Sequence, residues 1–541
     1  MQQWRINLIL VFIILFGAAI IGKLFFIQVF QGDFYRALAQ GLYSLDEEIQ
    51  GKRGEVFFKN GEPLSINMDW PLVFSSPQEI KTEKETAEKL AEILNLDKDL
   101  ILEKLKKDSL YSVIKKRLTN EEIENLRKID LAGVYLGKEL GRYYPQETLA
   151  SQVIGFLDAE KNGQYGIEGY YDEILQGKGR VSGSNLVLTI DYPIQFMAEK
   201  LLKEAKENLN IKGGEIIVIN PNSGKILALA NFPNFNPNKY SEITDFDIFQ
   251  NSATQKIFEP GSVFKPITMA AALNEGKITP KTTYFDEGMV KIGTLSIYNY
   301  DERVYGEQTM TEILEKSINT GAVFVEKQLG QKLFFEYIEK FGIFEKTKID
   351  LQETVPENKE FHEGWEQNRE INFATASFGQ GIEMTSIQLI RAYSAIVNGG
   401  KLVTPHIVEK IKGENQVFET ASNLDEGQVI SKKTSSQLTA MLVSVVENGF
   451  AKSARIPGYY VAGKTGTAQV SWSALNIDKR GYSDETWQTF VGFAPAFNSQ
   501  FVILVKLDNP ETRTAEYSTV PIFHDLAKYI VDYYQIPPDY Q

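Results

Sequence analysis

The sequence predicts an α+β fold with a single membrane anchor, an extended pedestal domain and a second domain built on one antiparallel sheet. Three observations support this prediction. Residues 6–30 are almost continuously apolar, and residues 81–130 combine Lys and Glu with helically spaced Leu and Ile. Residues 186–541 have strand pairs near both ends and mostly helical sequence between them, which is typical of a sheet with helices packed on it.

Composition narrows the class of protein. The 541 residues are 43% hydrophobic, enough for more than one packed domain, and the net charge of −14 argues against a nucleic-acid partner. The absence of cysteine excludes disulfides and thiol catalysis. The three histidines are far apart in the sequence, so we expect no metal site, and no motif calls for a cofactor.

The apolar run over residues 6–30 predicts a transmembrane helix, because about 20 apolar residues cross a bilayer. A cleaved signal peptide is the alternative, but the run is longer than the usual signal core and no good A-x-A site follows it. Arg5 places residues 1–5 in the cytoplasm by the positive-inside rule. The bulk of the chain is then expected outside the cell membrane.

Residues 33–185 are predicted to form the pedestal. Asn60-Gly61 is a turn signal beside a short apolar strand. Thr82 with Glu85, and Thr119 with Glu122, have the spacing of helix capping boxes. The charge run between them indicates solvated helices with one buried face and needs no ligand to explain it.

Residues 186–541 are predicted to form the second domain. A helix is expected after Asp191, and residues 215–220 and 225–230 predict a hairpin around Pro221-Asn222-Ser223-Gly224. Residues 489–494 and 501–507 predict another strand pair. The chain between the two pairs is expected to be helical.

Three short motifs occur in one order within this second domain: Ser262-x-x-Lys265, Ser317-x-Asn319 and Lys464-Thr465-Gly466. Together they predict a serine nucleophile with a lysine base in an acyl-transfer site. Each motif alone is weak, since Ser112-x-x-Lys115 and Ser65-x-Asn67 fit the same patterns.

Context separates Ser262 from these other matches. Ser262 follows a Pro260-Gly261 turn and precedes an apolar segment, residues 268–273, that predicts a buried helix. Ser112 has alternating charged and apolar neighbours, so we expect it on an ordinary surface helix.

A lysine three residues after a serine lies on the same helical face and can reach its hydroxyl. Lysine is a poor base at its usual pKa of about 10.4, and burial with a second cation nearby, Lys464, would lower that pKa. Pro266 removes the amide that would bond the Ser262 carbonyl, which predicts a small local distortion.

Ser317 and Asn319 are expected on a loop or helix end that faces the nucleophile. Ser317 can pass a proton to a leaving amine, and Asn319 can hold Lys265 or a substrate amide. Helix capping is the alternative for both residues and would be preferred if the motif stood alone.

Lys464-Thr465-Gly466-Thr467 is preceded by strand-like sequence, so the motif is expected on an edge strand that binds a substrate carboxylate through Lys464 and Thr465. Gly466 would let a substrate backbone approach. The amides of Ser262 and Thr467 would form an oxyanion hole. A Gly-rich turn is the alternative.

With these motifs the chain resembles the class B penicillin-binding proteins, the monofunctional peptidoglycan D,D-transpeptidases. Further segments that resemble the family are Arg53-Gly54, Arg142–Pro145, Gly166–Gly169 and Phe373–Gly381. The resemblance implies that Ser262 is acylated by a peptidoglycan stem peptide with release of D-alanine, and that a neighbouring stem then attacks to form a crosslink. It also implies that penicillin and other β-lactams acylate the same serine, and that a multi-span glycan polymerase is a partner.

Two positions depart from the family pattern: Phe58 replaces a common aspartate, and Val263 replaces a common threonine or serine. The sequence Glu259-Pro260-Gly261-Ser262 resembles the division type more than the elongation type. A D,D-carboxypeptidase or β-lactamase on the same domain remains an alternative, as does an inactive cell-wall scaffold. The anchor and pedestal favour the transpeptidase, and the intact Ser262, Lys265 and Lys464 argue against the scaffold.

Overall fold

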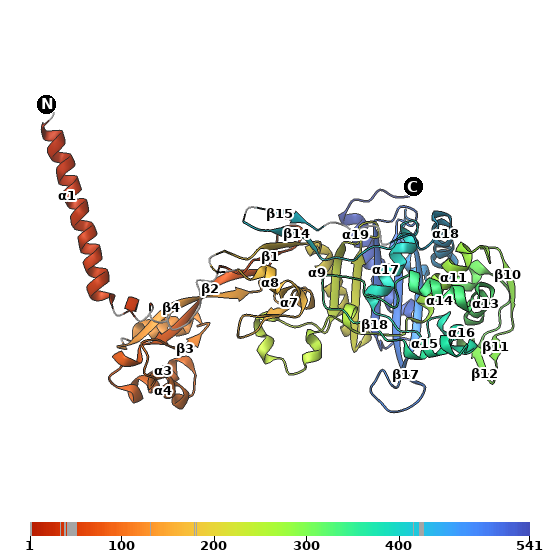
Figure 1. Ribbon diagram of the computed structural model, residues 1–541, viewed down its shortest axis with the longest axis horizontal. Coiled ribbons are helices and arrows are strands. Elements are labelled where there is room, and N and C mark those ends of the chain that lie inside the picture. Colours follow the sequence, from red (N-terminus) through yellow and green to blue (C-terminus); the bar gives the residue numbers. More distant parts are fainter. Residues whose placement is uncertain are drawn as a thin grey trace. The chain divides into compact units, whose positions relative to one another are not determined.

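The structure is a computed structural model that describes residues 3–32, 34–36, 39, 51–129, 131–177, 179, 181–414, 416–420 and 427–540 (Figure 1). The first of its two compact units comprises Met1–Arg53, Asn67–Tyr143 and Gly177–Ser182, and the second comprises Gly54–Ile66, Tyr144–Gln176 and Gly183–Gln541. Residues 1 and 2 of the expected cytoplasmic tail, and residue 33 at the expected start of the pedestal, lie outside the described residues. The domain boundary at residue 185 stays a prediction.

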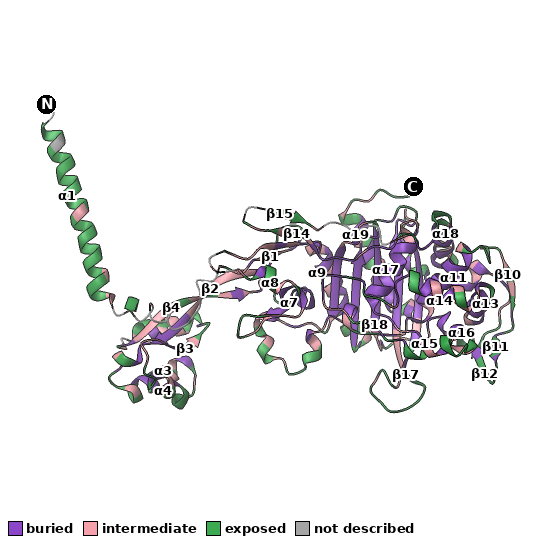
Figure 2. Cartoon of the chain, in the orientation of Figure 1, coloured by how far each residue is buried: buried purple, intermediate pink, exposed green. Residues whose placement is uncertain are grey.

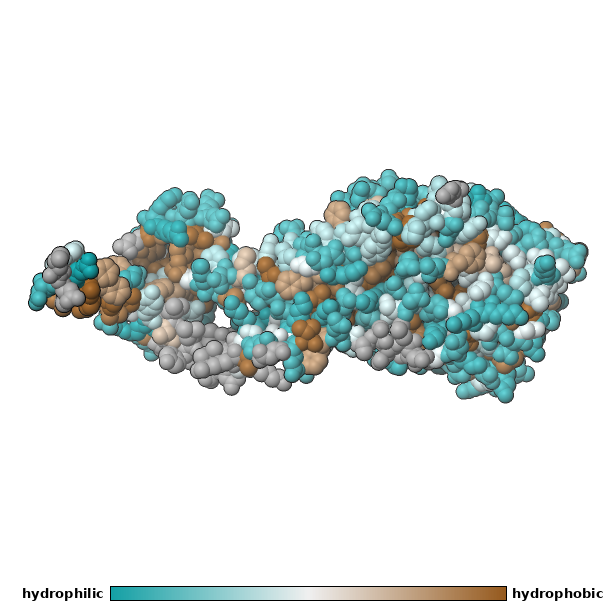
Figure 3. Space-filling view, turned by 90° about the horizontal axis from the view of Figure 1, so that it is seen from above, coloured by the Kyte–Doolittle hydropathy of each residue, from teal (hydrophilic) through white to brown (hydrophobic). Residues whose placement is uncertain are grey.

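The predicted apolar helix is confirmed. It consists of α1 (Gln3–Phe25), which continues as a π-helical turn, η1 (Phe26–Phe30). The segment Gln3–Phe30 is 28 residues long with a mean hydropathy of 2.7, long and apolar enough to cross a membrane. Most of its described large apolar side chains are exposed: α1 is mainly green in Figure 2, and apolar residues are brown in the space-filling view of Figure 3.

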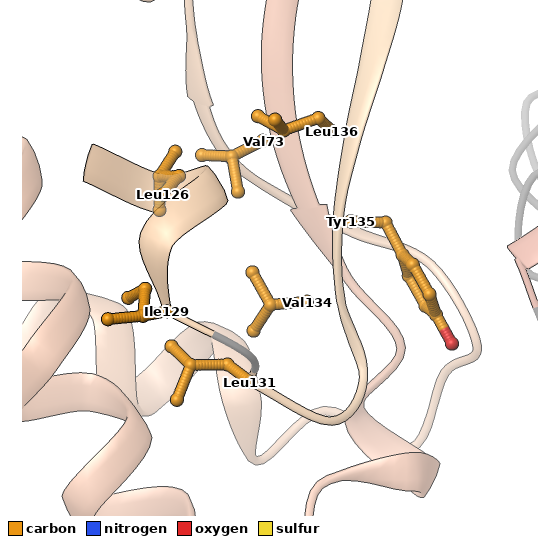
Figure 4. Close-up of a pocket in the computed structure, with 7 residues that line it drawn as sticks. All are labelled: Val73, Leu126, Ile129, Leu131, Val134, Tyr135 and Leu136. Carbon is orange, nitrogen blue, oxygen red and sulfur yellow. The ribbon is translucent and has the colours of Figure 1, made fainter. Parts of the chain in front are cut away.

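In the described residues of the first unit from Asn67 to Tyr143, three strands combine with three α-helices. The strands are β2 (Pro63–Ser75, which begins in the second unit), β3 (Ser112–Lys116) and β4 (Val134–Tyr143), and the helices are α3 (Glu83–Leu94), α4 (Lys98–Leu105) and α5 (Asn120–Lys128). Strand β2 pairs with both β3 and β4. The apolar faces of these elements form a separate small core, which contains a cavity of about 30 Å³ lined by Val73, Leu126, Ile129, Leu131, Val134, Tyr135 and Leu136 (Figure 4).

The prediction that Ser112 lies on a surface helix is wrong, because Ser112–Lys116 is strand β3. The β-branched pair Val113-Ile114 and the alternation of buried and partly buried residues fit a period of two. Side chains three residues apart on a strand point to opposite faces, so Ser112 and Lys115 cannot act together. Lys115 instead donates to Glu122 Oε1 at 2.6 Å and to the Leu94 carbonyl at 2.9 Å.

One of the two predicted capping boxes is confirmed. The Thr119 hydroxyl accepts from the Glu122 amide, and the Glu122 carboxylate accepts from the Thr119 amide, at the start of α5. The other is wrong in the described structure: Thr82 is the N-cap residue of α3, but its side chain makes no capping hydrogen bond.

The predicted antiparallel sheet is confirmed in the second unit. Its five strands run in the order β16-β17-β18-β8-β9. Their bounds are β16 Ala462–Ser471, β17 Tyr482–Ala494, β18 Phe501–Asp508, β8 Gly213–Ile219 and β9 Ile226–Phe232. Both predicted strand pairs are present, since β8 pairs with β9 and β17 with β18. Strand β16 lies at the edge of the sheet.

Two groups of helices cover this sheet, whose strand β8 is buried along its whole length (Figures 1 and 2). In the first group α9 (Tyr192–Leu209), which begins after Asp191 as predicted, contacts α19 (Thr519–Tyr533). In the second group α17 (Ser386–Val397) and α18 (Lys432–Asn448) contact each other and α11 (Lys265–Asn274). Helix α11 carries Lys265 and is therefore part of this packed layer.

The remaining elements of the second unit surround these layers. Strand β7 (Asn185–Leu188) pairs in parallel with β1 (Val56–Phe57) and antiparallel with β14 (Val408–Lys412), which pairs with β15 (Val417–Glu419). The other bounds are α6 Ser151–Ile154, β5 Phe156–Leu157, β6 Gly163–Gln164, α7 Gly166–Tyr170, α8 Asp172–Leu175, α10 Ser252–Gln255, β10 Thr283–Asp286, β11 Met289–Ile292, β12 Leu295–Tyr298, β13 Gly306–Thr309, α12 Met310–Glu315, α13 Asn319–Leu329, α14 Gln331–Lys340, α15 Lys359–Glu366 and α16 Glu370–Ala376.

The two threonines that start α3 and α5 give a matched test of the capping analysis. Thr119→Ala removes a cap worth about 1 kcal/mol, so amide hydrogen exchange in residues 119–128 should accelerate about fivefold. Thr82→Ala should leave exchange in residues 82–94 unchanged. Equal acceleration in both helices, measured by mass spectrometry of peptides from the full chain, would contradict this account.

Candidate active site

Ser262 lies on a 3-10 turn, η5 (Gly261–Phe264), directly before α11. Pro266 has no amide hydrogen to give to the Ser262 carbonyl, which accepts instead from the Lys265 amide. The predicted local distortion is therefore present as one turn of 3-10 helix. Ser262 is partly exposed, whereas residues 263–273 are buried.

Neighbouring segments hold this turn by hydrogen bonds. The Tyr393 hydroxyl donates to the Val263 carbonyl at 2.7 Å, and the Thr268 hydroxyl donates to the Ser377 carbonyl at 2.7 Å. The Gly261 amide donates to the Gly379 carbonyl at 2.9 Å. The segment 373–381, which the sequence analysis singled out, thus supports the turn that carries Ser262.

Glycines allow two segments to approach this turn closely. A Cβ atom on Gly379 would lie 2.1 Å from the Gly261 carbonyl oxygen, so no larger residue fits there. A Cβ atom on Gly466 would lie 3.0 Å from the Pro260 oxygen and 3.0 Å from Val263 Cγ1. Gly466 was expected to admit a substrate backbone, but the close neighbour that it accommodates in the structure is the turn next to Ser262.

The structure brings Lys265, Ser317, Asn319 and Lys464 together. Lys265 Nζ donates to the Ser317 carbonyl at 2.6 Å and to Asn319 Oδ1 at 2.8 Å, and lies 3.3 Å from Ser317 Oγ. Lys464 Nζ donates to Ser317 Oγ at 2.9 Å and to the Thr465 carbonyl at 3.0 Å. Within the described residues, the Lys265 amine hydrogen bonds with the second motif rather than with Ser262.

Both lysine side chains are almost completely removed from solvent, at 1% exposure for Lys265 and 0% for Lys464. Burial, followed by the nearby charge of Lys464, holds the pKa of Lys265 well below its usual value. Burial lowers the pKa of Lys464 to about 7. Both causes that the sequence analysis invoked for Lys265 are therefore present.

Ser317 and Asn319 lie where the sequence analysis expected them, on a loop and at a helix end. Ser317 has φ of +55°, and Asn319 is the first residue of α13. The alternative in which they cap the helix is wrong, because the N-cap residue is Ile318. The side-chain amide of Asn319 instead accepts from Lys265 through Oδ1 and donates to the Tyr298 carbonyl through Nδ2 at 3.1 Å.

Lys464, Thr465, Gly466 and Thr467 lie on β16, so the prediction of an edge strand is confirmed and the alternative of a Gly-rich turn is wrong. Thr465 is buried, and Thr467 is partly exposed. The Thr467 hydroxyl accepts from the Ala515 amide at 3.2 Å.

The carboxylate of Glu259, beside the turn that carries Ser262, was not assigned a role from the sequence. The Glu259 carboxylate accepts from the Gly381 amide at 3.1 Å and from the Tyr482 hydroxyl at 3.0 Å. Burial raises the pKa of Glu259 to about 7. Its place before Pro260 was visible in the sequence, but nothing local pointed to Tyr482 as its partner. In the part of the chain that the structure describes, no group of three or more His, Asp or Glu side chains could hold a metal ion.

Family models match most of the chain. The penicillin binding protein transpeptidase domain matches residues 214–528, and the penicillin-binding protein dimerisation domain matches residues 48–185. Among curated proteins, Stage V sporulation protein D of Bacillus subtilis is 32% identical over 93% of this chain and 82% of its own length. The probable peptidoglycan D,D-transpeptidase PbpC of Pseudomonas aeruginosa is 30% identical over 99% of this chain and 96% of its own.

Solved structures agree with these matches. Penicillin binding protein 3 from Mycobacterium tuberculosis, complexed with aztreonam, is 25% identical with a TM-score of 0.72 and covers 90% of this chain and 97% of its own. Penicillin Binding Protein 2X from Streptococcus thermophilus is 21% identical with a TM-score of 0.73 over 90% of this chain and 80% of its own, which shows a common fold. The chain belongs to the penicillin-binding proteins, as a class B member that combines a dimerisation domain with a transpeptidase domain.

Proposed function

We propose that this chain is a serine-type peptidoglycan D,D-transpeptidase that crosslinks stem peptides through an acyl-enzyme on Ser262. One observation carries the proposal: a partly exposed serine lies on the turn directly before a buried helix, whose Lys265 amine is held by Ser317 and Asn319. The chain belongs to the class B penicillin-binding proteins and has a relative named as a peptidoglycan D,D-transpeptidase, which supports the stem peptide as the substrate.

The two shortest contacts of Lys265 are contacts that a neutral amine can make. A neutral amine has two N–H groups and one lone pair. The Ser317 carbonyl and Asn319 Oδ1 can only accept, so they take both N–H groups. The lone pair is left to accept the proton of Ser262, with the contact tightening when substrate binds.

In acylation, Ser262 Oγ attacks the carbonyl carbon of the D-alanyl-D-alanine bond while its proton moves to Lys265 Nζ. The carbon–nitrogen bond then breaks, and the leaving amine of D-alanine receives the proton from Lys265 through the Ser317 hydroxyl. In the second half, the amine of an acceptor stem attacks the ester and returns its proton by the same route. Ser262 regains its hydroxyl and a new peptide bond is formed.

The third motif is proposed to bind the substrate. The Lys464 ammonium and the Thr465 hydroxyl favour a terminal carboxylate beside β16, and Gly466 keeps this strand close to the Ser262 turn. The amides of Ser262 and Thr467 are proposed as the oxyanion hole, since fixed N–H donors stabilise the charge that develops on the carbonyl oxygen.

The helix α1 supports a further part of the proposal, a chain anchored in the cell membrane with its N-terminus in the cytoplasm and its catalytic domain outside. A multi-span glycan polymerase is the proposed partner. The division type is proposed over the elongation type because of the sequence Glu259-Pro260-Gly261-Ser262.

The assignment of Ser262 is tested by labelling with a fluorescent penicillin. The wild-type protein should be labelled covalently, and Ser262→Ala should abolish labelling because no acyl-enzyme forms. Ser112→Ala removes the serine of the other S-x-x-K sequence, which lies on strand β3, and should be labelled like the wild type.

The other possible outcomes of this labelling would favour one of the alternative functions or contradict the assignment of Ser262. Full labelling of Ser262→Ala would contradict the assignment, and an unlabelled wild type would favour the scaffold. Loss of label from the wild type within seconds would favour a β-lactamase, because a transpeptidase stays acylated for minutes or longer. Crosslinked rather than trimmed stem peptides in a synthetic reaction would separate the transpeptidase from a carboxypeptidase.

The lysine pair predicts the pH dependence of acylation. The neutral form of Lys265 is the base, so the acylation rate should rise as the pH passes upward through its lowered pKa. Lys464→Met removes one of the two causes that lower the pKa of Lys265, so the acid limb of the profile should move to higher pH.

Lys464→Arg is the matched control for this experiment, since it retains a cation. The acid limb of its profile should lie at lower pH than that of Lys464→Met. Rates of labelling by penicillin between pH 5 and 10, normalised to each variant's maximum, measure the midpoint. A midpoint that stays in place or moves to lower pH in Lys464→Met would refute the electrostatic coupling.

A further inference from the structure

Helix α13, which begins with Asn319, is capped by a residue from outside the helix. Its N-cap residue is Ile318, whose side chain has no polar atom, although the first amides of a helix need acceptors. The Thr320 amide donates to Asn299 Oδ1 at 3.1 Å, and the Thr320 hydroxyl lies 3.0 Å from the same oxygen. Asn299 therefore does what a capping Ser or Asp would do.

A buried carboxylate fixes the orientation of Asn299. Asn299 Nδ2 donates to both oxygens of Asp286 at 3.0 Å, so its Oδ1 must face Thr320. Asp286 is 0% exposed and also accepts from the Tyr305 amide at 2.8 Å and from the Thr320 hydroxyl at 2.5 Å. A buried carboxylate is stable only with such a set of donors.

Asp286, Asn299 and Thr320, called here the Asp286–Asn299 cluster, are linked directly to the residues that hold Lys265. Tyr298 and Asn299 are consecutive, and they bond to the consecutive residues Asn319 and Thr320, because the Tyr298 carbonyl accepts from Asn319 Nδ2. Asn319 Oδ1 then holds Lys265. Ser317, just before the helix, has φ of +55°, a conformation that costs a non-glycine residue energy and needs its surroundings to maintain it.

We propose that Asp286 and Asn299 are positioning residues for the reaction: they cap α13 from outside and so hold Ser317 and Asn319 against Lys265. Neither residue contacts the reacting atoms, and both act through Asn319 and Ser317. This inference rests on the proposed function, because its test reads the acylation of Ser262.

A double-mutant cycle tests the proposal with Asp286→Asn, which keeps the shape of the side chain and removes its charge. Asp286→Asn should slow acylation by fluorescent penicillin about tenfold in the wild-type background. In the Asn319→Ala background the same change should slow acylation less than about twofold, because the Asn319 side chain through which Asp286 acts is already absent. Equal factors in the two backgrounds would show a purely structural effect and would overturn the proposal.

Two further variants complete the test. Glu287→Gln makes the same change of charge on the neighbouring, exposed residue and should leave the rate unchanged. Thr320→Val removes the hydroxyl that donates to Asp286 but keeps the branched shape, so the same cycle can be run with it if Asp286→Asn does not fold. A labelled wild type with undiminished rates in both Asp286→Asn and Thr320→Val overturns this inference alone, whereas an unlabelled wild type overturns the proposed function and this role with it.

Discussion

The site depends on one hydroxyl group, that of Ser317, which lies between two buried amines. Lys464 Nζ is 2.9 Å and Lys265 Nζ 3.3 Å from this oxygen. Two full positive charges this close and this far from water would repel each other strongly. Loss of the Lys265 proton relieves the repulsion, which is why burial and Lys464 together hold the pKa of Lys265 well below its usual value. In the proposed mechanism this arrangement supplies the base without histidine.

The surrounding fold brings together three segments that are far apart in the sequence. Helix α11 is buried in the second helical layer, β16 is the edge of the sheet, and α13 begins at the second motif. Gly466 lets β16, and Gly379 lets the segment 373–381, approach the Ser262 turn closely. The Asp286–Asn299 cluster, in turn, caps α13.

Local patterns predicted the α+β class, the apolar helix and both strand pairs, because each of these features depends on the composition or periodicity of short stretches of sequence. Local reasoning was wrong where two structures fit one pattern. The charged and apolar alternation around Ser112 belongs to a strand, and the spacing of Thr82 and Glu85 fits a capping box that does not form. Contacts between distant residues, such as Asn299 with Thr320 and Glu259 with Tyr482, leave no periodic signal that a single sequence could reveal.

The central claim, that burial and Lys464 hold the pKa of Lys265 well below that of an ordinary lysine, is tested most directly by nuclear magnetic resonance of the protein labelled with 13C at the lysine ε-carbons. The Lys265 resonance is assigned by its absence from the spectrum of Lys265→Arg, and its chemical shift is followed with pH. The account predicts that Lys265 titrates well below the exposed lysines, whose pKa is about 10.4. Titration of Lys265 together with those exposed lysines would contradict it.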